Sequence, residues 1–106
     1  MDIYEMREYQ QKERQTNKII KVPISYYEDL RKSLTEETDL DKYSSKKYLI
    51  DYLIDVRIIK IVKASCQEST QIGLDNLTPN ERIFYDSLKE NVDSFKREVY
   101  YEEQKN

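Results

Sequence analysis

The sequence is short of the residue types that most catalytic and ligand-binding motifs require. Its 106 residues include one glycine, two prolines and one cysteine, and neither histidine nor tryptophan. Without histidine the chain lacks the commonest general base, the serine–histidine and cysteine–histidine pairs and the ligands of most zinc sites. A single glycine cannot build a glycine-rich phosphate loop. We therefore expect a protein that is not an enzyme and that uses no metal and no cofactor.

The same scarcity points to a helical fold. Tight turns between strands depend on glycine and proline, so an all-β chain is disfavoured. The length is that of one domain, and we expect a single all-α domain over residues 1–106. The net charge of −3 is unlike that of a protein whose main task is to coat DNA, since such proteins carry a basic face.

No segment of the sequence resembles a signal peptide or a membrane span. Residues 1–8 lack an apolar run, and the apolar runs elsewhere reach about three residues, far below the roughly 20 that a span requires. Cys66 has no second cysteine with which to form a disulfide. These features are typical of a cytoplasmic protein.

Apolar residues that recur every three or four positions predict a bundle of four helices, of which the third and fourth are long. The predicted helices cover residues 2–16, 25–36, 45–67 and 79–103. The predicted connections are an extended segment at 17–24, an acidic loop at 36–44 and a loop at 68–77 that holds Gly73.

The clearest local signal is the start of the fourth helix. Thr78 is a typical N-cap, Pro79 suits the first helical position, and Glu81 has the spacing of a capping box. The predicted N-caps of the other helices are Asp2, Ser25, and Ser44 or Ser45.

The third helix is apolar on two faces, which is typical of a helix with more than one packing partner. The ten tyrosines are numerous for a core of this size, and both core packing and an association surface explain them. The third and fourth helices are thus the expected source of a subunit interface. The candidate partner-interface residues are Tyr26, Tyr27, Ile50, Ile54, Arg57, Ile58, Ile61, Tyr85 and Phe95.

Arg57, Lys60 and Lys63 recur every three residues on the third helix and have three interpretations. They are a basic stripe that contacts nucleic-acid phosphate or an acidic protein, or they are the solvent side of a helix that buries its other faces. In the third interpretation, Arg57 anchors an interface, since arginine is favoured where carboxylates need a partner.

Two further sites are disfavoured by the sequence. The acidic run at 36–41 lacks the central glycine and the final glutamate of a calcium loop. A helix-turn-helix DNA reader would need a basic last helix, yet residues 79–103 carry seven acidic and four basic residues. Any contact with DNA is therefore expected to be weak or indirect.

The order of these motifs resembles the A domain of archaeal GINS subunits. That family has an arginine–lysine motif late in its central helix, then a loop and a Leu-Thr-Pro-x-Glu helix start with an aromatic residue soon after. Arg57, Lys60 and the run from Leu77 to Tyr85 match this pattern. The segments that carry the resemblance are 1–9, 12–14, 22–31, 55–62 and 77–85.

The resemblance implies a structural subunit of the replicative helicase assembly. GINS subunits form a tetramer that bridges the MCM ring and a RecJ-like partner, which implies a cytoplasmic, nucleoid-associated protein. The branch that is matched carries a β-rich B domain after the A domain. No β-rich segment is present in this sequence, so either the sequence is part of a longer subunit or this member has only the A domain and the B domain is absent. The alternative is a small homo-oligomeric helical regulator with weak nucleic-acid contact through Arg57, Lys60 and Lys63.

Overall fold

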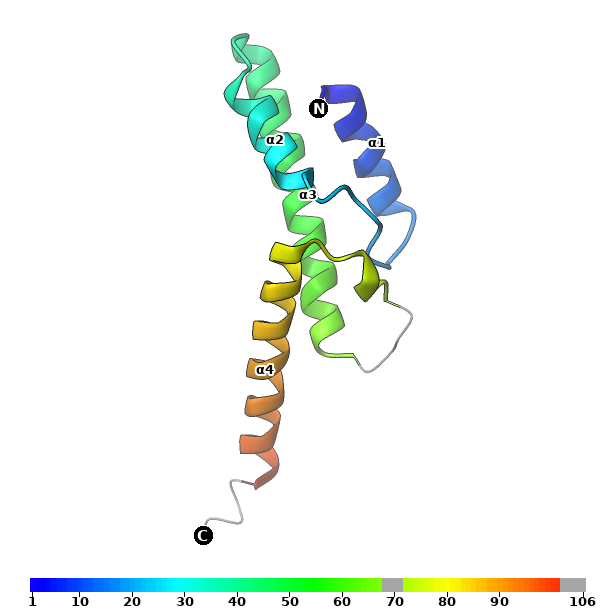
Figure 1. Ribbon diagram of the computed structural model, residues 1–106, viewed down its shortest axis with the longest axis vertical. Helices are drawn as coiled ribbons and strands as arrows, with labels where there is room; N and C mark the ends of the chain where they lie inside the picture. Colours follow the sequence, from blue (N-terminus) through cyan, green and yellow to red (C-terminus); the bar gives the residue numbers. More distant parts are fainter. Residues whose placement is uncertain (68–71, 102–106) are drawn as a thin grey trace.

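The computed structural model describes residues 1–67 and 72–101, and these residues form a helical bundle (Figure 1). The α-helices are α1 (Ile3–Arg14), α2 (Tyr26–Thr35), α3 (Leu40–Ser65) and α4 (Pro79–Tyr101), with a short 3₁₀ turn, η1 (Leu74–Asn76), before α4. The predicted all-α class, with long third and fourth helices, is confirmed. None of the helices in these two stretches combines the length and apolarity needed to cross a membrane.

Helix α3 is the axis of the fold, and α1, α2 and α4 all pack on it. Figure 1 shows α1 and α2 beside its first half, while α4 starts near its middle, runs in the same direction and continues past its end. The result is an elongated molecule whose lower part is α4 alone. The assignment of residues 1–106 to a single domain stays a prediction.

Two apolar clusters hold the helices together. The upper cluster joins α1, α2, the connection between them and the first half of α3, and consists of Met6, Val22, Tyr26, Leu30, Leu49, Ile50 and Leu53. The lower cluster joins the end of α3 to the start of α4 and comprises Ile19, Ile61, Ala64 and Tyr85, with Ile72, Leu74, Leu77 and Leu88 packed around them. Arg57 and Lys60 lie on α3 between the two clusters.

The start of α3 corrects the sequence prediction. The segment 36–44 is not a loop throughout, because α3 begins at Leu40, and its N-cap is Asp39, whose carboxylate accepts a hydrogen bond from the amide of Lys42 at 3.0 Å. Ser44 and Ser45 lie within the helix. The first turns of α3 are polar because they are exposed, and an exposed helix needs no apolar stripe to form.

The N-caps of α1 and α2 are the predicted residues Asp2 and Ser25, but only Asp2 makes a side-chain capping bond. Asp2 accepts a hydrogen bond from the amide of Glu5 at 2.9 Å, as predicted. Ser25 makes no capping bond to the backbone, since its hydroxyl instead donates to the Asp29 carboxylate at 2.9 Å. Two parts of the sequence predictions lie outside the described residues: residues 102–103 of the predicted helix 79–103, and residues 68–71 of the predicted loop 68–77.

Gly73 ties the loop before α4 to the connection between α1 and α2. Its φ of 83° is left-handed, a conformation that favours glycine, and a Cβ at this position would collide with the carbonyl oxygen of Ile19. The amide of Ile19 donates to the carbonyl of Ile72 at 2.8 Å. This close backbone approach places η1 and the start of α4 against the rest of the fold.

Candidate functional site

The start of α4 is fixed by a reciprocal pair of hydrogen bonds. The amide of Thr78 donates to Glu81 Oε1 at 2.9 Å, and the amide of Glu81 donates to Thr78 Oγ1 at 3.3 Å. The predicted capping box is therefore confirmed. Unlike most capping boxes it is buried, so the Glu81 carboxylate faces the interior of the molecule and needs a further partner.

That partner is Arg57, from the middle of α3. Its Nε and Nη2 donate to the two oxygens of Glu81 at 2.6 and 2.8 Å, a bidentate pair. Nη1 donates to Glu13 at 3.2 Å and to the carbonyl of Ile20 at 3.1 Å, and Nη2 also donates to the carbonyl of Asn76 at 3.5 Å. All five N–H donors of the guanidinium thus have acceptors, which explains how an arginine only 1% exposed can be accommodated.

Glu13 extends the interaction to α1 and to a second cation. Lys60, one turn after Arg57 on α3, donates to Glu13 Oε1 at 2.6 Å and to the Glu13 carbonyl at 3.0 Å. Both residues are buried. We call Glu13, Arg57, Lys60 and Glu81 the central ion network; it is electrically neutral and joins α1, α3 and α4.

Two tyrosines of α2 enclose the network. The hydroxyl of Tyr27 donates to Glu81 Oε2 at 2.5 Å, and the guanidinium carbon of Arg57 lies 5.8 Å from the centre of the Tyr26 ring. Burial raises the pKa of both phenols above the usual value, Tyr27 also through its hydrogen bond to Glu81 and Tyr26 also through the charge of Glu13. Both phenols therefore stay neutral at neutral pH. The hydrogen bond from Tyr27 to Glu81 joins α2 to the start of α4.

The charges of the Arg57–Glu81 pair are fixed near neutral pH. Burial by itself would lower the pKa of Arg57, but its hydrogen bonds and attraction to Glu81 outweigh burial and the pKa is raised. Burial would raise the pKa of Glu81, but hydrogen bonds from Arg57, the Thr78 amide and Tyr27 outweigh it and the pKa is lowered. A pair held in this way exchanges no proton at neutral pH, so its role is to position helices.

An exposed basic stripe, one of the three interpretations of Arg57, Lys60 and Lys63, does not form on α3. Arg57 and Lys60 are buried in ion pairs within the chain, and Lys63 is the one member of the three that is exposed. The interpretation that these residues form the solvent side of the helix is also wrong for Arg57 and Lys60, because both are buried. The pairing of Arg57 with carboxylates was the correct interpretation of its chemistry, but those carboxylates belong to the same chain.

Most of the candidate interface residues also face inward. Tyr26, Ile50, Arg57, Ile61 and Tyr85 are buried, so they are not available to a partner on this surface. Tyr27 and Ile54 are half-buried, whereas Ile58 is 39% and Phe95 66% exposed. Burial differs among the isoleucines of α3 because three helices and a connection pack around different parts of this helix. The two apolar faces in the sequence did not predict which isoleucines would be buried.

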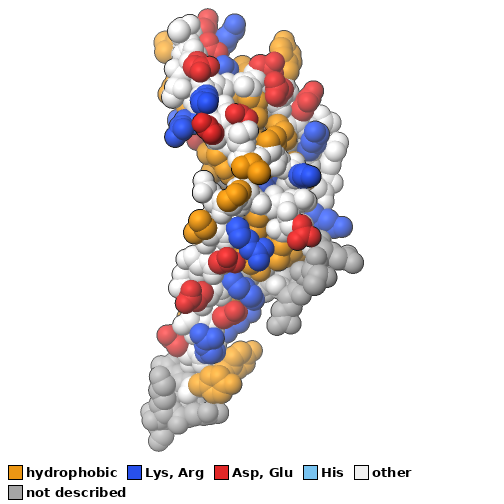
Figure 2. Space-filling view, in the orientation of Figure 1, with side chains coloured by type: hydrophobic (Ala, Val, Ile, Leu, Met, Phe, Trp, Pro, Cys, Tyr) orange, Lys and Arg blue, Asp and Glu red, His pale blue; other side chains and the backbone are white. Residues whose placement is uncertain are grey.

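The structure adds Phe84 to the exposed set, a residue that the sequence did not single out. Phe84, 38% exposed, follows the capping box by three residues and lies beside Ile58 across the α3–α4 junction, where both line a hollow of about 310 Å³. We call Tyr27, Ile54, Ile58 and Phe84 the proximal apolar surface. Figure 2 shows hydrophobic side chains around the start of α4 and again near its far end.

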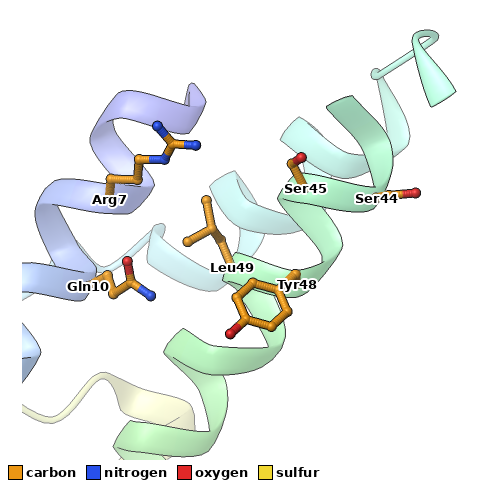
Figure 3. A pocket seen from close by; sticks show the side chains of 6 residues that line it. All are labelled: Arg7, Gln10, Ser44, Ser45, Tyr48 and Leu49. Carbon is orange, nitrogen blue, oxygen red and sulfur yellow. The ribbon is translucent and has the colours of Figure 1, made fainter. Parts of the chain in front are cut away.

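A second hollow, of about 450 Å³, lies between α1 and the first half of α3 (Figure 3). Arg7 and Gln10 of α1 face Tyr48 and Leu49 of α3, with Ser45 above them. This lining has one cation and several neutral polar groups. In the residues described here, no three His, Cys, Asp or Glu side chains are grouped so that they could hold a metal ion.

The family of the chain follows from comparison with known families. The Sld5 family model, described as the GINS complex protein helical bundle domain, matches residues 1–100. The chain belongs to the GINS helical-bundle family. No curated protein and no solved structure matched it. The GINS chain is therefore a subunit of a complex in DNA replication that assembles with other GINS subunits, and the central ion network lies wholly within the matched residues.

Removal of the Arg57 side chain should be highly destabilising to the GINS chain. Arg57→Ala leaves the buried carboxylate of Glu81 without its cation and removes one of the two cations that pair with Glu13, and we expect it to lower the free energy of unfolding by about 3–5 kcal/mol. Urea denaturation followed by circular dichroism measures this. Lys63→Ala, a matched change at an exposed position of α3, should stay within about 0.5 kcal/mol of the wild type. Equal effects of the two substitutions would contradict the structure.

The lowered pKa of Glu81 predicts a loss of stability in acid. Because the folded state holds Glu81 ionised, the stabilisation is present above the ordinary glutamate pKa and is lost as pH falls through the lower folded value. Between about pH 5 and about pH 3 the wild type should lose more stability than Glu81→Gln, which has no charge to titrate at this position. Urea midpoints across this range give the comparison; parallel pH profiles would show that Glu81 titrates as an ordinary carboxyl.

Proposed function

We propose that this chain is an archaeal GINS subunit of the A-domain type, and that within a GINS tetramer it scaffolds the MCM replicative helicase with a RecJ-like partner. It acts in the cytoplasm at the nucleoid, with DNA contact that is weak or indirect. The observation that carries the proposal is the proximal apolar surface, a group of partly exposed large apolar side chains at the α3–α4 junction that the central ion network holds together.

The composition of this surface is that of a subunit interface. Ile58 and Phe84 offer large apolar groups to solvent from two different helices, with Asn80 at the edge of the hollow between them. Interfaces have apolar and aromatic residues at the centre and polar groups at the rim, and a few such residues supply most of the binding free energy. Burial of one isoleucine or phenylalanine side chain contributes about 1.5–3 kcal/mol.

The alternative of a nucleic-acid-binding regulator has lost its support. It required Arg57, Lys60 and Lys63 to form an exposed row, and the first two are paired with Glu13 and Glu81 in the interior. A role in the complex through protein contacts is therefore the function that the side chains favour.

The proximal apolar surface is tested by placing a charge within it. Ile58→Asp should weaken association with a second GINS subunit from the same genome by about a hundredfold, because an apolar contact is replaced by a desolvated carboxylate. Ile58 suits this test because it is exposed, whereas an aspartate at Ile50, buried in the upper cluster, would unfold the chain. Co-expression followed by light scattering of the purified complex measures the association.

Ile59→Asp is the matched control. Ile59 is the next residue on α3, is 53% exposed, and lies about 100° around the helix from Ile58, outside the hollow. The Ile59→Asp variant should assemble like the wild type. A folded Ile58→Asp variant that still assembles normally would contradict the assignment of the proximal apolar surface to the interface. An equal loss of association in both variants would contradict it as well.

A further inference from the structure

The second half of α4 carries an apolar stripe that begins at Leu88, against the lower apolar cluster, and becomes exposed toward the end of the helix. Leu88, Val92, Phe95 and Val99 recur at intervals of four, three and four residues, the spacing of a coiled-coil seam. We call them the distal stripe. Phe95 is 66% and Val99 56% exposed, and Figure 1 shows this part of α4 beyond the end of α3.

The distal stripe continues a seam that the chain already uses. Going backwards along α4, the same seven-residue spacing leads to Tyr85 and Glu81, which are buried against α3. The first half of the seam therefore has its partner helix inside the chain, and the second half lies along the same line without one. Such continuity favours a second helix that takes up the seam where α3 ends.

Charge along the seam distinguishes between possible partners. One edge carries Arg82, Lys89 and Lys96 at seven-residue intervals, whereas the other edge has Asn91 and Glu98 at the corresponding places. Lys89 contacts Asp93 at 3.3 Å on the side away from the stripe. Lys96 forms no ion pair with any residue of 1–67 or 72–101.

A second copy of this chain fits the seam poorly. An antiparallel pair related by a two-fold axis brings each edge of one stripe against the same edge of the other. With Val92 packed on Phe95 of the copy, Lys89 faces the copy's Lys96, and the like charges oppose association. In a parallel pair, Lys96 of one copy lies beside Asn91 of the other, so no ion pair forms to favour association.

We propose that the distal stripe binds an amphipathic helix of a different GINS subunit, one with acidic residues along the edge that faces Lys89 and Lys96. The proposal rests on the proposed function and specifies a partner for it. Apolar side chains supply the contact, and the basic edge selects the acidic partner over a second copy of this chain.

The first experiment needs only the purified chain. Lys96→Glu turns each Lys89–Lys96 opposition into an attraction, so it should lower the dissociation constant for self-association by about tenfold or more relative to the wild type. Sedimentation equilibrium measures both constants. The double variant Lys89→Glu/Lys96→Glu restores like charges, here both acidic, and should lose the gain; adding Phe95→Asp to Lys96→Glu should also abolish it.

Arg97→Glu is the matched control for this experiment. It changes the charge by the same amount one residue away, on the face of α4 opposite the stripe, and should associate like the wild type. If Lys96→Glu shows no gain, or if Arg97→Glu gains equally, the geometry of the seam is wrong and the proposal is overturned.

The second experiment uses another GINS subunit from the same genome. Lys89→Glu/Lys96→Glu should weaken binding to that subunit by about tenfold or more, while Arg97→Glu binds normally. Normal binding by the double variant overturns the proposal. Because the self-association arm involves no second subunit and leaves Ile58 untouched, its failure is distinguishable from failure of the proximal surface, which Ile58→Asp tests alone.

Discussion

The two hydrogen bonds between Arg57 and Glu81 determine where α4 lies, and the rest of the molecular surface depends on that position. Glu81 is held in the first turn of α4 by its own capping box, and Arg57 is held in the middle of α3 by acceptors from three other segments. A buried arginine with five acceptors tolerates little movement, since each lost acceptor leaves a buried donor unpaired. Replacing such a network by apolar residues can cost little stability, so we regard it chiefly as a device that fixes the register of α4 on α3.

This register creates two different surfaces from one pair of helices. Beside the network, α3 and α4 are close enough for Ile58 and Phe84 to line one hollow, with Tyr27 bonded to Glu81 at its edge. Past the end of α3, α4 continues with its seam exposed. A chain built in this way has one surface that depends on tertiary structure and another that depends on a single helix, which suits a subunit that contacts more than one neighbour in the GINS complex.

The sequence predicted those features that depend on local chemistry. The helix count follows from apolar periodicity within each segment, and the Thr78–Glu81 capping box and the cap at Asp2 each follow from residues within one turn. The start of α3 was misplaced by five residues, because the sequence at 40–44 has no apolar stripe and was interpreted as a loop, whereas it forms an exposed helix capped by Asp39. The sequence left three interpretations open for Arg57 and Lys60 because their partner Glu13 is more than forty residues away, and no local pattern connects them. The same long-range packing buried Ile50 and Ile61, which the two apolar faces of the third helix had suggested for a partner, and Tyr26 and Tyr85, which the large number of tyrosines had suggested.

The most direct test of the central ion network is hydrogen exchange along α4, measured by mass spectrometry on the wild type and on Glu81→Gln. If Arg57 holds α4 through Glu81, amides at 82–88 should exchange more than about tenfold faster in the variant, while those of α1, α2 and the first half of α3 keep their protection. Unchanged protection at 82–88 would contradict the account, because α4 would then be held on α3 by the lower apolar cluster alone.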